Sequence, residues 1–339
     1  MHRRMSSLRV WRYAAVALAV VCCGAKPYEF GSFPAWHDTD RPTGDISIEY
    51  GKPRKRLDQI GWIVGIPSRI LPMNSKINNH HLSEETIGKL RDYLVRNDLS
   101  DVSVYVNDYD PKGQWRHLKA NKRVGAGWRY TFGLFSLATY TILPGRIFGG
   151  DNYNPYTNTL SLHSDVPALV LRESAFAKCV HGHKRPGFYA MVDDLPVASL
   201  LVDVQAARDV FAYARMEHDW PIEKQAYHVL YPQMGIDIMT AGTPFISSWW
   251  AGPVLGFGGA IAGHATGHVM AARREKRLAA EPPEEPPSEV RLATHLEPLE
   301  PVPDGALCPW FDSAAGTWNE LLWQGDGVEP GFSELSNRL

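Results

Sequence analysis

The chain has 339 residues, of which 44% are hydrophobic and 11% aromatic, so it is long and apolar enough to bury a substantial core. This composition excludes a disordered chain. With 35 basic and 37 acidic residues the formal net charge is -2, which gives no electrostatic reason to expect a nucleic-acid partner.

The first 25 residues resemble an export signal. Arginines stand ahead of the apolar run "AAVALAVV", which is too short to span a bilayer. The small residues that end at Ala25 predict cleavage after it, which would place the chain in the periplasm or cell envelope. A lipid on Cys22 or Cys23, as in a lipoprotein, and an uncleaved signal anchor are the alternatives.

Cleavage there leaves two cysteines in the mature chain, Cys179 and Cys308. An oxidising compartment permits a disulfide between them. Because Cys179 occupies an apolar position of an expected helix, a buried free thiol is equally compatible with the sequence.

The N-terminal part leads into the ordered body. Residues 26–57 are rich in proline, glycine and charge, and predict a loosely structured segment with one strand at "ISIEY". The run "GWIVGIPSRILPM", residues 61–73, predicts the first strand of the body, interrupted by Pro67.

A helix and a strand should follow. Ser83, flanked by Leu82 and Ile87, predicts a helix N-terminus, and this helix should end near Asn97. In "DVSVYVNDYD" valines alternate with other residues, which predicts a half-buried strand and then a turn at "DPKG".

The middle of the chain combines an apolar run, a strand and a helix. Residues 125–147 predict a buried or membrane-contacting helix, and Arg129 favours burial. Residues 157–162 alternate polar and apolar side chains, as in an edge strand. Ser164 or Asp165 is then expected to cap a helix that carries Pro167 in its first turn.

Two longer helices are expected next. One covers "LPVASLLVDVQAARDVFAYARME", and the other begins after Asp219 and should end at Pro232. Helices and strands are mixed without the regular alternation of a parallel sheet, which predicts an α+β fold. The first helix has one apolar stripe, formed by Leu200, Val204, Ala207 and Phe211.

Residues 241–272 form a hydrophobic, glycine-rich segment without a charged residue. Gly259, Gly263 and Gly267 recur every four residues, the pattern on which membrane helices approach closely. We expect the segment to span or enter a membrane, with the following basic residues on the cytoplasmic side. The alternative is a hairpin broken at Gly252-Pro253 that docks on the body or lies in the membrane interface.

The C-terminal part begins with a linker, residues 273–305, which is basic and then rich in proline and glutamate. Residues 306–339 form a tail whose aromatic residues could dock back on the body.

The stretch "PALVLRESAFAKCV", residues 167–180, raises the question of a metal site. Zinc peptidases of the His-Glu-x-x-His type place two histidines on one helix face, and the glutamate activates a zinc-bound water. Here those positions hold Arg172, Glu173 and Phe176. Neither arginine nor phenylalanine can bind zinc, and at this spacing the guanidinium could stack on the ring instead.

The surrounding sequence resembles an uncharacterised bacterial family of exported, zincin-like proteins. The resemblance is carried by "PGRIFGGDNYNPYTNTLSLHSDVPALVLRESAFAK", "GIPSRIL", "NNHHLSEET" and "EKQAYHVLYP", and covers residues 58–270. It implies a zincin-like core in residues 58–240, with a small mixed sheet, an edge strand, the motif helix and a downstream helix. In that helix Glu223 best matches the third zinc ligand, although both motif histidines are replaced.

Other residues could rebuild a metal site. His163 lies just before the expected motif helix, and His181 and His183 lie just after it in "CVHGHK", where a solvated loop is the simpler interpretation. Glu223 also suits the first turn of a helix, where the macrodipole favours a carboxylate. His264 and His268 have ligand-like spacing but no carboxylate nearby, which favours helix packing or interfacial hydrogen bonding.

These observations support two hypotheses. The first is a non-catalytic, membrane-associated envelope protein without a cofactor, which binds the membrane and an extended peptide or envelope protein. The second is a zinc metallopeptidase with altered ligands and Glu173 as general base. No phosphate-binding loop or Gly-x-Ser-x-Gly elbow supports nucleotide binding or serine hydrolysis.

Overall fold

The computed structural model describes residues 46–52, 55–143, 147, 150–195, 198–243 and 250–280. All of them belong to the first of two compact units, Met1–Ala293. The expected signal peptide, the lipidation site, most of the entry segment, Cys308, the proline-rich part of the linker and the tail lie outside the described residues.

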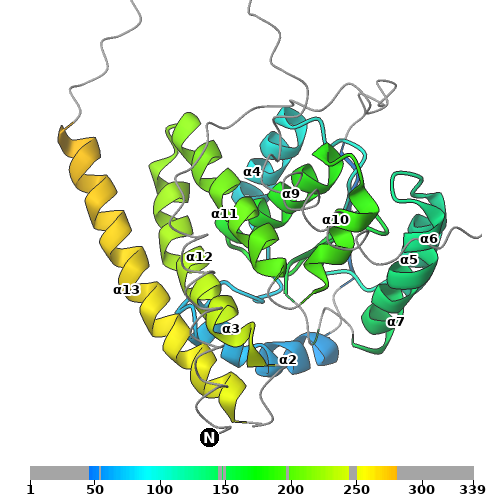
Figure 1. The fold of residues 1–339 in the computed structure, drawn as a ribbon, viewed down its shortest axis with the longest axis horizontal. Helices are drawn as coiled ribbons and strands as arrows, with labels where there is room; N and C mark the ends of the chain where they lie inside the picture. The colour runs from blue at the N-terminus through cyan, green and yellow to red at the C-terminus, as the bar shows by residue number, and fades with distance from the viewer. Residues whose placement is uncertain are drawn as a thin grey trace, which may run out of the picture. The chain divides into compact units, whose positions relative to one another are not determined.

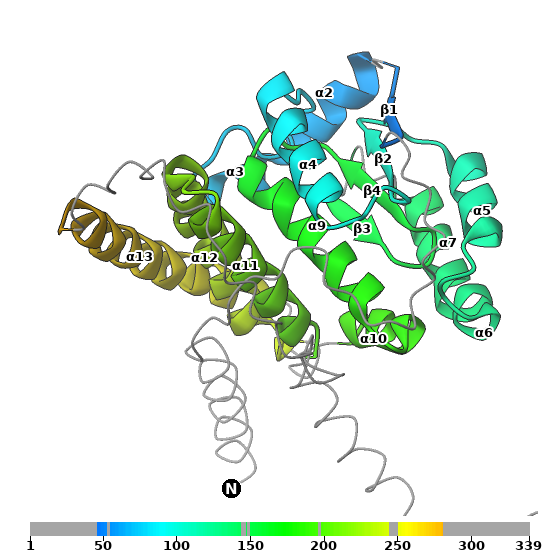
Figure 2. The same ribbon diagram turned by 90° about the horizontal axis from the view of Figure 1, so that it is seen from above.

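A small mixed sheet of four strands forms one part of this unit (Figure 2). The strands are β1 (Ile48–Tyr50), β2 (Ser103–Val106), β3 (Asn152–Asn154) and β4 (Thr159–Leu162), in the order β1-β2-β4-β3. Strands β1, β2 and β4 run parallel to one another, and β3 pairs antiparallel with β4 at one edge of the sheet. The described part of the chain is therefore an α+β fold, as expected.

Helices make up most of the described chain. The central one is α9 (Pro167–Gly182), which is buried from Ala168 to His181 at nearly every position and contacts α4, α11, α12 and the sheet (Figure 1). The others are α2 (Lys55–Val64), α3 (Ile66–Ile70), α4 (Glu84–Arg96), α5 (Pro111–Ala120), α6 (Ala126–Trp128), the π-helical turn η1 (Arg129–Gly133), α7 (Leu134–Ile142), α10 (Pro186–Asp193), α11 (Ser199–Met216), α12 (Trp220–Thr240) and α13 (Ala251–Ala280).

Several predicted elements are confirmed where local signals were strong. Ser83 caps α4 by accepting a bond from the Thr86 backbone N–H at 3.3 Å, and Asn97 follows the helix. Asp219 caps α12 in the same way through Ile222. The strand in "ISIEY" is β1, and the four residues predicted as the apolar stripe of α11 are buried.

The strand predicted for residues 61–73 is wrong, because this run lies in α2 and α3. Pro67 is the second residue of α3, where a proline is tolerated since its missing N–H would have no helical partner. Trp62, Ile63 and Ile70 are exposed, so the hydrophobicity of the run does not reflect burial in a sheet.

The turn predicted at "DPKG" is the N-terminus of α5, which Asp110 caps through the Lys112 N–H. The strand before it, β2, was expected to be half-buried, but Val104, Tyr105 and Val106 are all buried, so both of its faces are covered. Residues 125–147 do not form a fully buried helix: Phe135 and Ile142 of α7 are 75% and 76% exposed.

The edge strand was assigned to the wrong segment. Residues Thr159–Leu162 form β4, which lies inside the sheet, and β3 is the edge strand next to it. The side chains of Thr157 and Thr159 are buried, and their hydroxyl oxygens are hydrogen-bonded to each other at 2.7 Å. The Thr159 hydroxyl also bonds to Oε1 of Gln114. The polar residues that alternate along this segment are therefore there to form internal hydrogen bonds, and they do not indicate a face exposed to solvent.

Ser164 and Asp165 do not cap α9, whose N-cap residue is Val166. The Asp165 carboxylate instead accepts bonds from the Ser83 backbone N–H, the Ser83 hydroxyl and the Thr86 hydroxyl, at the start of α4. Burial alone would raise the pKa of Asp165, but these bonds outweigh it and lower the pKa to about 2. The loop before α9 therefore fixes α4.

The helix predicted to end at Pro232 continues to Thr240, and α13 packs along it. A Cβ on Gly259, Gly263 or Gly267 would lie 2.2 to 2.4 Å from a backbone oxygen of α12. The close approach expected from the glycine spacing is therefore present, with α12 as the partner. Gly252 and Pro253 fall in the first turn of α13 and do not break it.

The helix α13 extends to Ala280, so the first residues assigned to the linker are helical. Among the described residues, no helix combines the length and apolar composition needed to cross a bilayer. Cys179 is buried in α9, and the Cys308 to which the sequence could pair it lies outside the described residues.

Candidate functional site

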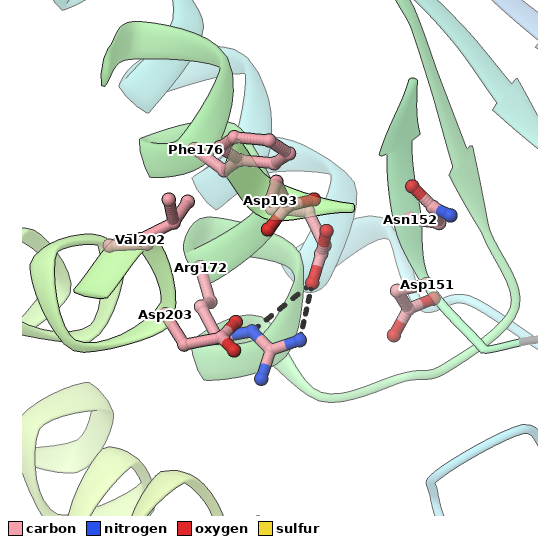
Figure 3. Close-up of a pocket in the computed structure, with 9 residues that line it drawn as sticks. Asp151, Asn152, Arg172, Phe176, Asp193, Val202 and Asp203 are labelled. Carbon is pink, nitrogen blue, oxygen red and sulfur yellow. Dashed lines mark hydrogen bonds and ion pairs between the residues drawn. The ribbon is translucent and has the colours of Figure 1, made fainter. Parts of the chain in front are cut away.

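A polar pocket of about 180 Å³ lies between α9, α10, α11 and the start of β3 (Figure 3). The motif positions Arg172, Glu173 and Phe176 all line it, so the helix face that the sequence singled out does face a cavity. The remaining lining residues are Asp151, Asn152, Asp193, Val202, Asp203 and Ala206.

Arg172 holds Glu173 in a buried ion pair. Its Nη2 and Nε donate to Glu173 Oε1 at 2.8 and 3.1 Å, and its Nη1 donates to Gln233 Oε1 on α12 at 3.2 Å. Burial alone would lower the pKa of Arg172, but the charges of Glu173 and Asp203 raise it. The guanidinium is thus a fixed charge that ties α9 to α12.

The second oxygen of Glu173 is also engaged. Its Oε2 accepts the backbone N–H of Tyr153 at 3.1 Å. Tyr153 is the middle residue of β3, opposite Leu160, and an N–H that leaves the ladder in this way points to the open edge of the sheet. Glu173 therefore serves as an acceptor for the edge strand.

The pocket holds a surplus of carboxylates. Burial, aided by the charges of Asp203 and Glu173, raises the pKa of Asp193 to about 8. Burial likewise raises the pKa of Asp151 to about 6 and that of Asp203. Arg172 compensates only part of this charge, and a pKa of about 8 keeps Asp193 largely protonated at neutral pH.

Phe176 is 7% exposed and packs on aromatic rings. Its centroid lies 5.6 Å from that of Tyr153, at a right angle, and 6.4 Å from that of Tyr189. The predicted stacking of Arg172 on this ring is replaced by the ion pair with Glu173.

The candidate histidines do not converge on the pocket. His163 Nδ1 contacts Asn107 Oδ1 at 3.3 Å, and His181 Nε2 contacts Asn158 Oδ1 at 2.8 Å. His183 accepts a bond from the Arg185 N–H at 3.1 Å. All three are buried, so the solvated loop expected for His181 and His183 is wrong.

Glu223 lies away from the pocket and is part of an arginine network. Its Oε1 accepts from Arg215 at 2.8 Å and from the Tyr227 hydroxyl at 3.0 Å, and its Oε2 accepts from Arg274 of α13 at 3.3 Å. These contacts assign it a structural role at the α11, α12 and α13 junction.

His264 and His268 serve helix packing. His264 Nε2 bonds to the Leu71 carbonyl oxygen at 2.8 Å, and the His268 ring lies 4.4 Å from that of His228. The interpretation that favoured helix packing over metal binding for this pair agrees with these contacts.

No group of three or more His, Cys, Asp or Glu side chains in the described residues is arranged to hold a metal ion. The donor chemistry at the motif positions does not fit zinc either, because a guanidinium repels the ion and both Glu173 oxygens are engaged. Asp193 and Asp203 were missed in the sequence, although each is an acidic residue within an apolar run, the available signal.

Comparisons of the chain with protein-family models, curated proteins and solved structures gave no match.

Proposed function

We propose that the chain is an exported, membrane-associated protein with a degenerate zincin-like core, which has a binding or structural role in the cell envelope and is not a peptidase. The observation that carries this proposal is the state of Glu173. A general base needs a carboxylate oxygen that can accept a proton from a water. In Glu173, Oε1 accepts hydrogen bonds from Arg172 and Oε2 accepts the backbone N–H of Tyr153 in the edge strand.

The order of the elements supports a zincin-like scaffold. An antiparallel edge strand, β3, precedes the motif helix α9, although the inner strand β4 lies between them and the resemblance implies an edge strand directly before the helix. A downstream helix presents a carboxylate to the motif face, but this residue is Asp203 of α11 and replaces Glu223 in that role.

The pocket favours a small ligand group. Its volume of about 180 Å³ is below the roughly 300 Å³ at which drug-sized ligand sites begin, and it opens beside Asn152 of the edge strand. An extended peptide could thus place one side chain there. Full strand addition would compete with Glu173 for the Tyr153 N–H.

The proposal is tested by restoring the motif. In the full-length chain we expect substoichiometric zinc by elemental analysis and no peptidase activity. The R172H/F176H variant should bind about one zinc per chain, because both imidazoles would face the pocket beside Asp203. Adding D203N should weaken this binding at least about tenfold.

The matched control is R91H/V95H, which puts two histidines at the same spacing on an exposed face of α4 without a pocket. It should bind zinc only weakly. Stoichiometric zinc in the unaltered chain that disappears on changing His163, His181, His183 or Glu223 would contradict the proposal and restore the metallopeptidase hypothesis.

A further inference from the structure

An uncharged apolar surface covers the side of α13 that faces away from α12. Val254, Phe257 and Ile261 recur at spacings of three and four residues, so they share one helix face, and they are 55% to 59% exposed. Trp250, just before the helix, is exposed as well. The glycine face packs on α12, so this outer face has no partner among the described residues.

A second set of exposed apolar residues lies beside it. Trp62 and Ile63 of α2, Ile70 of α3 and the following Met73 are each more than half exposed. The bond from His264 to the Leu71 carbonyl joins the end of α3 to the middle of α13. In Figure 1 these elements reach the same lower end of the described part, and Figure 2 shows that α2 lies farther from α13 than α3 does.

The charges along α13 favour a lipid surface as the occupant. The uncharged part of the helix ends against Arg273, Lys276 and Arg277, which are exposed, and Lys276 follows Val269 by seven residues on the same face. Basic residues beside an apolar face complement anionic headgroups, and tryptophans such as Trp62 and Trp250 prefer the membrane interface.

We propose that α13, with α2 and α3, forms a surface that lies on an anionic bilayer, with the axis of α13 in the plane of the interface. The proposal rests on the membrane association proposed above and specifies its surface and lipid class. The orientation follows from packing: α13 is held along α12 by its glycines, and α12 carries charged residues such as Lys224 and Asp237. A position across the hydrocarbon would bury those charges.

The test is flotation of the full-length chain with vesicles of phosphatidylcholine alone or mixed with phosphatidylglycerol. We expect binding to the anionic vesicles, at least about tenfold weaker in F257E/I261E, because two apolar anchors are lost and two repelling charges are added. The R273E/K276E variant should lose binding to the anionic vesicles specifically. All variants keep the same N-terminal residues, so differences among them report on this surface.

The matched control is F135E/I142E on α7, which changes two apolar residues of similar or greater exposure outside the surface. It should bind as the unaltered chain does, and circular dichroism and thermal unfolding should show that both double variants remain folded.

Unchanged binding of F257E/I261E would overturn the inference and leave membrane association standing. Absence of binding by the unaltered chain would count against both. A change from dimer to monomer in F257E/I261E without vesicles would identify a second copy as the occupant and also overturn it.

Discussion

Arg172 brings a permanent positive charge into the pocket. A buried guanidinium needs partners, and it finds them in the neighbouring Glu173 and in Gln233. The acidic residues around it outnumber this one cation, and burial together with the charges of Asp203 and Glu173 raises the pKa of Asp193 to about 8. The net charge of the pocket therefore becomes more negative as the pH rises past the pKa of Asp193.

Asp193 makes this coupling measurable. Because its pKa is about 8 in the folded chain and 3.8 is the ordinary value, the native state holds a proton that the unfolded state releases between these pH values. The unfolding free energy should fall as pH rises from about 4 to about 8. In D193N this loss should shrink by at least about 1 kcal/mol between pH 5 and pH 8, since one pKa unit corresponds to about 1.4 kcal/mol.

Urea unfolding at a series of pH values measures this effect. D92N, at an exposed position of α4, serves as the control and should keep the slope of the unaltered chain. An identical pH dependence in D193N and D92N would show that Asp193 does not hold the proton.

At the scale of elements, the pair α12 and α13 depends on the absence of side chains. Gly235 and Gly259 each approach the other's carbonyl oxygen, so a Cβ on either would lie 2.2 Å from it. The two helices can therefore pack backbone to backbone. This close packing is stabilised by dispersion forces, but it leaves no room for a side chain at either glycine.

Two glycines of α13 provide a matched comparison. At Gly263 a Cβ would meet the Tyr231 carbonyl oxygen at 2.4 Å, whereas at Gly258 there is nothing within 4 Å. G263A should lower the unfolding free energy by about 1 to 3 kcal/mol through overpacking. G258A should be neutral or raise it by up to about 1 kcal/mol, because alanine favours the helix. Thermal and urea unfolding distinguish the two, and equal effects would contradict the packing described.

At the scale of the molecule, the described elements differ in how many neighbours support them. The central helix α9 packs against α4, α10, α11, α12 and the sheet, whereas α13 packs mainly against α12. An element supported from one side can open without the rest of the fold.

Native-state hydrogen exchange should reveal this difference. Amides of α9 are expected to exchange only through global unfolding, and those of α13 through a smaller opening, with a free energy at least about 1 kcal/mol lower. G263A should reduce the protection of α13 more than that of α9. Mass spectrometry of proteolytic fragments would resolve the two helices, and a shared opening free energy would refute the expected hierarchy.

The sequence by itself determined those elements whose signals are local. The Ser83 and Asp219 caps, the stripe of α11 and the glycine spacing of α13 act within one or two turns, so they could be recognised without knowing the fold. The α+β class followed from the same signals. The motif face of α9 was also recognisable, because residues four apart on a helix share a side.

Only the tertiary structure decided which residues meet. Thr159 of β4 is buried with its hydroxyl bonded to Gln114, whereas Trp62, Ile63 and Ile70 in the apolar run of α2 and α3 are exposed. Glu223 bonds to arginines while Asp203 enters the pocket, since the paths of α11 and α12 set their distances to α9. Sequence spacing fixes contacts within a helix, such as that of Arg172 with Glu173, but contacts between elements depend on how distant segments pack, and that packing placed Asp203 of α11 in the same pocket as Glu173.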